Sequence, residues 1–240
     1  MTLSVAKFLA ENYADYYDQE DALSGWRQLG ALDKCSNILR LCCGVQHNAI
    51  LEIGCGDGAI LQRLSKAGFG VRFTGLEISP SAMSRARQKC VPNLDVLLFD
   101  GYEVPFSGLC FDLAILTHVL EHVEHPRKLI QEASRVAKNV FIEVPLEDNW
   151  RLSDDFVFDR VGHINFYGRK TIRRLVQSRG MEISGAHLCH GSSASYVYRK
   201  GRLRGGLTYG IKEVALRLWP VAASACLTYH YALLCKSSTS

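Results

Sequence analysis

The sequence predicts an α/β fold built on one doubly wound parallel sheet, and three observations support this prediction. Short apolar runs of five to seven residues alternate with segments of helical periodicity along most of the chain. These runs lack a regular two-residue alternation, which is typical of strands covered on both faces. A glycine-rich segment, GCGDG at 54–58, directly follows the first run and precedes a helical pattern. In a sheet of this kind the ligand crevice lies at the carboxyl ends of the strands.

The elements can be placed in chain order. Two helices are predicted before residue 45. The strands are predicted at 49–53, 71–77, 94–100, 111–116 and 139–144, and the helices at 59–67, 81–89, 126–137 and 169–178. In the helix at 126–137 the apolar residues recur at helical spacing, which indicates one buried face.

The composition agrees with one globular domain. The chain has 240 residues and 26.8 kDa, with 48% hydrophobic and 22% charged residues, which excludes disordered, collagenous and coiled-coil proteins. We find no internal repeat and no long Pro- or Gly-rich linker. The prediction is a single domain over 1–240, with a helical cap at 1–45, a cofactor-binding core at 46–182, and C-terminal strands with a basic helical insert at 183–240.

Cysteine usage and the N-terminus predict a reduced, cytoplasmic protein. None of the nine cysteines forms a C-x-x-C pair, and the first residues lack the long apolar core of a secretory signal. The charge-free stretch 218–235 is about long enough to span a bilayer, but it contains Pro220 and several polar residues. A membrane span is therefore not predicted.

Charge is distributed unevenly along the chain. Residues 1–160 carry 16 basic and 22 acidic side chains, whereas residues 161–240 carry 12 basic and 2 acidic ones. This asymmetry suggests that the C-terminal part faces an anionic substrate, a nucleic acid or lipid headgroups. A solvated basic surface without a partner is the simpler alternative.

The glycine segment is a candidate cofactor turn. Gly54, Gly56 and Gly58 permit a tight turn and let a ligand approach the backbone amides at the start of a helix. Gly54, Gly56 and Ala59 also fit the dinucleotide pattern G-x-G-x-x-G/A. The turn alone therefore does not decide which cofactor binds.

Three acidic residues at the strand ends narrow the choice. Glu52 precedes the turn and would suit the positive charges of S-adenosylmethionine better than a pyrophosphate. Glu77 ends the second strand, where a carboxylate can accept hydrogen bonds from both hydroxyls of a ribose. This feature suits NAD as well as S-adenosylmethionine. Asp100, followed by Gly101, ends the third strand and could accept from an adenine amino group.

These features resemble the class I S-adenosylmethionine-dependent methyltransferases. The resemblance covers about residues 45–182 and rests on E-x-G-C-G-x-G, Glu77, Asp100 and the segment FDLAILTHVLEHVEHPRKLIQEASRV. It is strongest to small-molecule and natural-product enzymes with an H-V-L-E-H stretch. It implies a Rossmann-like seven-stranded sheet whose last strand, 228–236, is antiparallel.

The resemblance also implies cofactor contacts. The methionine portion would lie on Gly54, Cys55, Gly56 and Gly58, the ribose on Glu77, the adenine on Ile78, Asp100 and Gly101, and the reactive methyl near Thr117 and His118. Aromatic residues of the N-terminal helices often cover the cofactor in these enzymes. Tyr13 and Tyr17 are the candidates here, since an aromatic face attracts a sulfonium.

A histidine cluster lies in the stretch THVLEHVEH. His118, Glu121 and His122 have the i, i+3, i+4 spacing that places metal ligands on one face. The stretch is similar to the E-x-x-E-H of small-RNA 2′-O-methyltransferases and ubiquinone-pathway O-methyltransferases, which bind a divalent metal. Because His118 replaces a glutamate, we predict no metal and keep these three residues as candidate ligands. His118 and His163 are the candidate catalytic bases, since histidine titrates near neutral pH.

Two basic clusters follow, at 169–174 and 199–204, the second with Tyr196 and Tyr198 nearby. They could attract an anionic acceptor or an RNA strand. No RNA-binding module accompanies them, so nucleic acid is not the predicted partner. Peripheral membrane contact through 199–225 is a further interpretation.

The sequence therefore predicts a methyltransferase that transfers a methyl group to oxygen, nitrogen or carbon of a small or medium-sized acceptor and releases S-adenosylhomocysteine. Three alternatives stay open: a metal-assisted RNA 2′-O-methyltransferase, a nicotinamide-dependent oxidoreductase and a non-catalytic binding module with the nucleotide fold. The acceptor, the use of a base or a metal, and the oligomeric state do not follow from the sequence.

Overall fold

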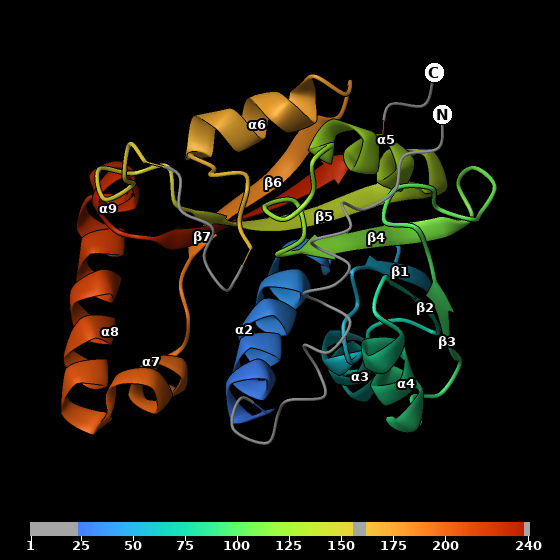
Figure 1. Cartoon of the computed structure of the whole chain (residues 1–240), viewed down its shortest axis with the longest axis horizontal. Coiled ribbons are helices and arrows are strands. Elements are labelled where there is room, and N and C mark those ends of the chain that lie inside the picture. The colour runs from blue at the N-terminus through green and yellow to red at the C-terminus, as the bar shows by residue number, and fades with distance from the viewer. Residues whose placement is uncertain (1–23, 156–161, 238–240) are drawn as a thin grey trace.

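The computed structural model describes residues 24–155 and 162–237. Its centre is a seven-stranded sheet with the order β3-β2-β1-β4-β5-β7-β6 (Figure 1). Strands β1 to β5 pair in parallel, and β7 lies antiparallel between β5 and β6. The strands are β1 (Ala49–Ile53), β2 (Arg72–Glu77), β3 (Leu94–Leu98), β4 (Phe111–Thr117), β5 (Ala137–Leu146), β6 (Glu182–Cys189) and β7 (Tyr229–Lys236).

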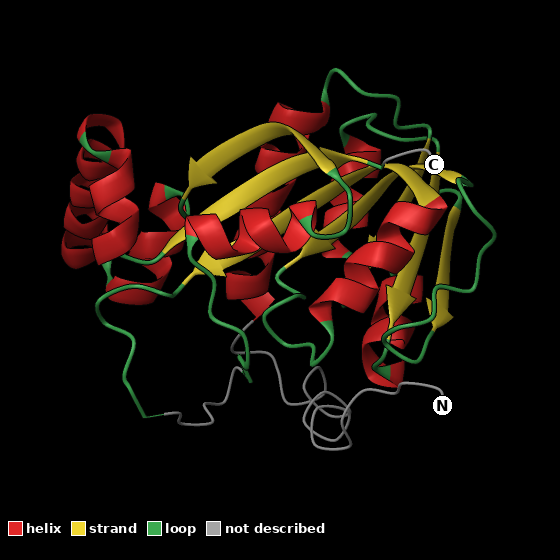
Figure 2. Ribbon diagram, turned by 90° about the horizontal axis from the view of Figure 1, so that it is seen from above, coloured by secondary structure: helices red, strands yellow, loops and turns green. Residues whose placement is uncertain are grey.

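Helices cover both faces of this sheet (Figure 2). One face carries α2, α3 and α4, the other carries α5 and α6, and α7 to α9 form an insert between β6 and β7 that extends beyond the sheet (Figure 1). The helices are α2 (Ser24–Cys42), α3 (Ala59–Lys66), α4 (Pro80–Gln88), α5 (Pro126–Val136), α6 (Arg169–Gln177), α7 (Ser193–Lys200), α8 (Arg202–Leu218) and α9 (Pro220–Cys226).

The two faces of the sheet give two hydrophobic cores. In β1, Leu51 and Ile53 point into the core beneath α5 and α6, while Ile50 points into the core beneath α2, α3 and α4. All three side chains are fully buried. The same holds for β4 and most of β5, which explains why these strands read as continuous apolar runs rather than as alternating ones.

The structure confirms the predicted fold class and the antiparallel last strand. The strands and helices predicted at 49–178 all occur, with ends shifted by a few residues. Strand β6 had no predicted bounds because this edge strand, EISGAHLC, alternates between exposed and half-buried residues and contains no apolar run. Of the two helices predicted before residue 45, the structure describes α2; Tyr13 and Tyr17 lie outside the described residues.

Local signals explain where the helices nearest the strand ends begin. Helix α3 begins after Gly58, whose φ of 73° lies in the left-handed region that glycine tolerates. Helix α4 begins with Pro80 after Ser79, whose hydroxyl accepts a hydrogen bond from the Ala82 amide. Within the described residues, no helix is both long and apolar enough to cross a bilayer.

Tyr102 supports the segment between β4 and α5. Its ring is 1% exposed, and its hydroxyl accepts hydrogen bonds from the amides of Glu124 (3.1 Å) and His125 (3.3 Å). The variant Tyr102→Phe keeps the ring but leaves both amides without this acceptor, so we expect it to lower the free energy of unfolding by about 1–2 kcal/mol. Chemical denaturation measures this change, and an unchanged midpoint and slope would contradict it.

Candidate functional site

The predicted site residues converge at the carboxyl edge of the sheet. The parallel register pairs Ile53 with Leu76 and Glu77 with Leu98, so the ends of β1, β2 and β3 lie side by side. Strand β4 lies on the other side of β1 and ends at Thr117. The segments 54–58, 77–79, 100–102 and 117–122 therefore lie along the same edge of the sheet, where the ligand crevice is expected in this class of fold.

The glycine turn is fastened to the end of β2. Gly54, Gly56 and Gly58 all have positive φ angles, of 73°, 54° and 73°. The amides of Gly54 and Cys55 both donate to the Leu76 carbonyl, at 2.8 and 3.0 Å. A Cβ atom on Gly54 would lie 2.7 Å from a methyl group of Val119, so a larger residue would require the Val119 side chain in the loop after β4 to shift.

Cys55 points away from the crevice. Its side chain is buried, and a Cβ atom on Gly75 of β2 would lie 2.6 Å from its sulfur. Burial raises the pKa of the Cys55 thiol well above its ordinary value. A contact between Cys55 and a ligand would therefore involve its backbone rather than its thiol.

Glu77 connects the turn to the segment after β2. One carboxylate oxygen accepts from the Gly56 amide at 2.7 Å, and the other accepts from the amides of Ile78 and Ser79, each at 2.9 Å. Burial raises the pKa of this carboxyl, while the three amides act against that shift. Each carboxylate oxygen can accept two hydrogen bonds, so the oxygen facing Gly56 has capacity for one hydroxyl of a ligand.

Glu52 lies beneath the turn with an unsatisfied oxygen. The residue is 1% exposed, and its Oε2 has no hydrogen-bond partner. Burial raises the pKa of Glu52 well above its ordinary value, whereas the positive charge of Lys34 on α2 lowers it. Because an unpaired buried carboxylate is costly, this position suits a cationic group of a ligand.

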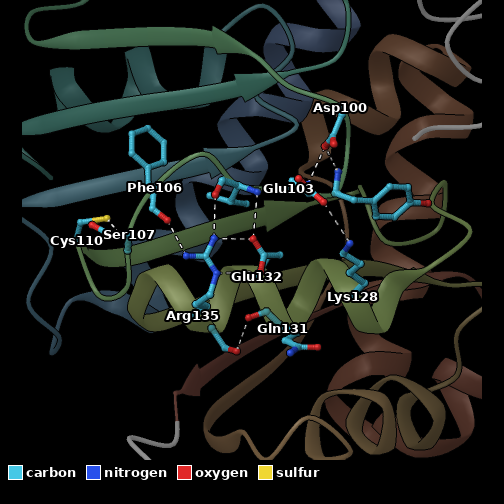
Figure 3. A network of polar contacts seen from close by, with 12 residues as sticks. Asp100, Glu103, Phe106, Ser107, Cys110, Lys128, Gln131, Glu132 and Arg135 are labelled. Atoms are coloured by element: carbon cyan, nitrogen blue, oxygen red, sulfur yellow. Dashed lines mark hydrogen bonds and ion pairs between the residues drawn. The ribbon is translucent and has the colours of Figure 1, made fainter. Parts of the chain in front are cut away.

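Asp100 begins a loop that is fixed to α5 (Figure 3). Its Oδ1 accepts from the amides of Tyr102 (2.8 Å) and Glu103 (2.7 Å), and Gly101 has a φ of 94°. Further along, the Arg135 guanidinium donates to the carbonyls of residues 104 and 106 and pairs with the carboxylate of residue 132 at 2.6 Å. Since Oδ1 holds the turn, Oδ2 is the Asp100 oxygen that could accept from a ligand.

An open hollow of about 510 Å³ lies beside this loop. It is lined by residues 98–100 and 103–105 and by Lys128, Glu132 and Arg135 of α5. Asp100 is its one residue from the expected cofactor set. The hollow therefore lies on the outer side of the loop, away from the glycine turn.

His118 lies between two buried carboxylates. Its Nδ1 is 3.1 Å from Oε1 of Glu121, and its Nε2 is 3.4 Å from Oε1 of Glu143. The backbone has the uncommon φ of 55°, and its amide donates to the Glu143 carbonyl at 2.9 Å. Burial and Lys34 oppose protonation of His118, but the two carboxylates outweigh them, so the pKa of His118 is raised.

Glu143 extends this cluster with residues that the sequence analysis missed. Its Oε1 is 3.3 Å from Nδ1 of His230 on β7, and its Oε2 accepts from Asn37 of α2 at 2.9 Å. Burial raises the pKa of Glu143, but the contacts with His118 and His230 outweigh it, so its pKa lies well below the ordinary range. The only sequence signal was a glutamate inside the otherwise apolar run NVFIEV.

A second cluster lies on the other side of Glu121. The rings of His122 and His163 make an edge contact with centroids 4.7 Å apart, and the Glu121 carbonyl accepts from the amides of Ile164 and Asn165. The Nδ1 atom of His163 is 2.7 Å from Oε2 of Glu147. The structure thus brings both predicted bases to the same edge, His118 paired with two carboxylates and His163 with one.

The two clusters contain donor types that metal ions bind. His118, Glu143 and His230 form one group and Glu121, His122 and His163 another, each with one ligand atom per residue within 4.8 Å of the others. The predicted candidates His118, Glu121 and His122 are therefore divided between two groups. In the first group both imidazoles lie within ion-pair distance of the Glu143 carboxylate, yet Nε2 of His118 and Oε1 of Glu143 make no hydrogen bond.

Comparison with known proteins decides the family. Residues 26–184 match the family described as "Methyltransferase domain", which is more than half of the chain. The chain belongs to this methyltransferase family. One relative of the methyltransferase is an uncharacterised protein of Methanocaldococcus jannaschii, which is 30% identical over 128 residues, or 53% of this chain and 55% of the relative. Another is the demethylmenaquinone methyltransferase of Tropheryma whipplei, which is 31% identical over 91 residues, or 37% of each chain.

Solved structures give the same fold. Phosphoethanolamine N-methyltransferase 2 of Haemonchus contortus, in complex with phosphomonomethylethanolamine and S-adenosylhomocysteine, superposes with a TM-score of 0.62 at 14% identity. The match covers 94% of this methyltransferase and 60% of the other chain. At this identity the likeness concerns the fold. The methyltransferase spans about half the length of the first curated relative and little more than a third of the second.

The contact between His118 and Glu143 predicts that the stability of the methyltransferase depends on pH. The variant Glu143→Gln leaves His118 paired with Glu121 but without its second carboxylate, and we expect it to lower the free energy of unfolding by about 3 kcal/mol. The folded pKa of Glu143 is lowered, so its contribution exists above the ordinary value of 4.5 and is lost at lower pH. The folded pKa of His118 is raised, so its contribution exists below 6.5 and is lost as pH rises through the raised value.

The difference between wild type and Glu143→Gln should therefore be largest between pH 4.5 and 6.5 and smaller on both sides. Denaturation at a series of pH values measures this difference. The matched control is Glu103→Gln, which removes an exposed carboxylate 3.8 Å from Lys128 and should change stability by less than about 1 kcal/mol. A difference for Glu143→Gln that does not vary with pH would reject the ion-pair interpretation.

Proposed function

We propose that this protein transfers a methyl group from S-adenosylmethionine to an oxygen or nitrogen atom of a small acceptor and releases S-adenosylhomocysteine. Its membership of the methyltransferase family supports the reaction class. One observation carries the choice of cofactor. The buried Glu52 oxygen without a partner, two residues before the glycine turn, suits the ammonium of the cofactor, whose positive charge would favour the ionised carboxylate, whereas a pyrophosphate would not.

The remaining residues of the crevice fit the other parts of this cofactor. The free acceptor capacity of Glu77 next to Gly56 suits a ribose hydroxyl, and Oδ2 of Asp100 suits the adenine amino group. Ile78 is half-buried next to Glu77, where it could cover one face of the adenine. When bound, the cofactor supplies a methyl group made electrophilic by the neighbouring sulfonium. The chain must hold the acceptor in line with that methyl group and receive its proton.

We assign His163 as the general base that receives this proton. The Glu147 carboxylate lies 2.7 Å from Nδ1, a distance at which it would accept a proton from that nitrogen and favour the tautomer that accepts at Nε2. His163 lies beside Glu121 and His122, at the end of the loop that follows β4. This pairing resembles the histidine–carboxylate pairs that orient a base in other enzymes.

His118 has a different role in this proposal. Both of its nitrogens face carboxylates, which makes it a poor acceptor for a substrate proton. As a cation it instead neutralises Glu121 and Glu143 and fixes the loop that borders the acceptor. His118 is thus a positioning residue.

The acceptor proposed here carries a negative charge. The guanidinium of Arg169 lies 5.5 Å from the ring centroid of Tyr231, and Arg173 donates to the hydroxyl of the same tyrosine at 3.2 Å. Tyr231 pairs with Val144 near the carboxyl end of β5, so both arginines stand at the crevice edge. The Nε atom of Arg169 is buried without a hydrogen-bond partner, which favours an anionic group nearby.

Calorimetric titration with S-adenosylhomocysteine, beside NAD in the same buffer, tests the cofactor. We expect binding of the former alone, and a loss of about 10- to 100-fold in affinity for Glu52→Gln because a charge-assisted contact is removed. Asp57→Asn is the matched control from the same turn. Asp57 pairs with Lys89 at 3.1 Å, so this variant should keep the wild-type affinity within about threefold. Binding of NAD, or equal affinities in wild type and Glu52→Gln, would overturn the cofactor assignment.

Kinetics with an acceptor found by screening phenols, amines and phosphorylated alcohols test the base. Release of S-adenosylhomocysteine is the readout. We expect His163→Gln to lower kcat by about 10²- to 10⁴-fold at unchanged affinity for the cofactor, because proton removal is lost. Glu147→Gln should retain more activity than His163→Gln and shift the pH profile of kcat. Wild-type kcat in His163→Gln would exclude this residue as the base.

A further inference from the structure

Helix α8 carries an apolar stripe that faces solvent. Its members are between 55% and 89% exposed: Leu203, Leu207, Ile211, Val214 and Leu218. At 100° per residue, the five positions lie within an arc of about 80° on the helix surface. An exposed apolar face of this regularity is typical of a surface that contacts a partner.

Three further exposed apolar residues lie in the insert or against it. Trp219 and Val221, at the start of α9, are 65% and 68% exposed, and Trp150, which follows β5, is 71% exposed. The Trp150 indole donates to the Cys226 carbonyl at 2.7 Å, which fixes its ring against α9. We call these eight residues of α8, α9 and the segment after β5 the apolar surface.

Contacts on the opposite face hold α8 in this orientation. Gly205 packs so closely on α7 that a Cβ atom would lie 2.5 Å from the Tyr196 carbonyl oxygen. Lys212 donates to the Thr228 carbonyl and lies 4.6 Å from the ring centroid of Tyr229. The apolar stripe therefore faces away from the protein because the other side of the helix is already packed.

The charges around the apolar surface are positive. On the helical projection, Arg204 lies about 20° beyond one edge of the stripe and Arg217 about 40° beyond the other. Helices α7 to α9 contain six basic residues and a single acidic residue, Glu213. The Glu213 carboxylate already contacts Arg217 (2.9 Å) and His190 (3.2 Å). Two copies pressed together through this surface would bring like charges into contact, whereas an anionic surface would complement them.

The insert stands at the same edge of the sheet as the candidate site. Strand β6 enters it at Cys189 and β7 leaves it at Tyr229. Both β5 and β6 run antiparallel to β7, so the insert connects to the edge at which β5 ends (Figure 1). The insert that carries the apolar surface is therefore attached at the edge at which the proposed acceptor would bind.

We infer that the apolar surface docks on an anionic lipid bilayer, with α8 and α9 lying in the plane of the interface. Leucine and valine side chains would enter the acyl boundary, the two tryptophans would lie at the headgroup level, and the flanking arginines would contact lipid phosphates. This arrangement needs no membrane-spanning helix. The inference that the apolar surface docks on a bilayer is independent of the proposed reaction.

Sedimentation of the full chain with vesicles tests this inference. We expect binding to vesicles of phosphatidylcholine and phosphatidylglycerol, much weaker binding to phosphatidylcholine alone, and weakening by salt. The triple variant Leu203→Ser, Leu207→Ser, Ile211→Ser should lose at least about tenfold in vesicle affinity, since three apolar side chains are removed from the interface. The matched control is Val71→Ser with Leu98→Ser, which changes two residues that are 62% and 52% exposed outside the insert.

Two further measurements make the result decisive. The triple variant should keep the wild-type circular dichroism and affinity for S-adenosylhomocysteine, which separates failure of docking from failure of the fold or of the proposed reaction. Vesicles should shift the tryptophan emission to shorter wavelength, and Trp150→Phe with Trp219→Phe should abolish the shift. Equal sedimentation of wild type and triple variant would overturn the inference, as would a wild-type dimer in solution that the triple variant dissociates, because a second copy would then cover the surface.

Discussion

The carboxylate of Glu77 is the contact on which the crevice depends. It binds three backbone amides, from Gly56, Ile78 and Ser79, and so connects the turn after β1 to the segment after β2. The Leu76 carbonyl, next to it in the chain, holds the same turn through two further amides. The position of the proposed cofactor turn is therefore fixed by one strand end. Hydrogen bonds from amides to a buried carboxylate are strong because water neither competes for the carboxylate oxygens nor screens their charge.

Buried charges gather on one side of the sheet at its carboxyl edge. Glu52 and Glu143 lie beneath α2, and this helix supplies Lys34 near the first and Asn37 as a donor to the second. The imidazole of His118, whose pKa is raised, lies between Glu121 and Glu143. Burial of so many ionisable groups costs stability unless they are paired. A cluster of buried ionisable groups of this kind is typical of a functional site.

The sequence predicted what local patterns determine. Apolar runs and helical periodicity indicated the strands and helices from 49 to 178, and four ordered motifs indicated the family. The pairing of Glu143 with His230 could not be predicted, because it depends on β7 inserting between β5 and β6. The sequence analysis interpreted 199–225 as a region of peripheral membrane contact, but it did not predict helix α8 or which of its apolar residues are exposed. Both features depend on which elements become neighbours, and local patterns in the sequence do not indicate this.

The contact between Gly54 and Val119 has a kinetic consequence. These residues belong to the turn under the proposed cofactor and to the loop that carries His118 and Glu121, and a single added carbon at Gly54 would already overlap Val119. A displacement of the turn toward this loop would therefore have to be met by a movement of the Val119 side chain. If the cofactor and the acceptor bind as proposed, this contact would connect the two ligand positions and would favour binding of the cofactor before the acceptor.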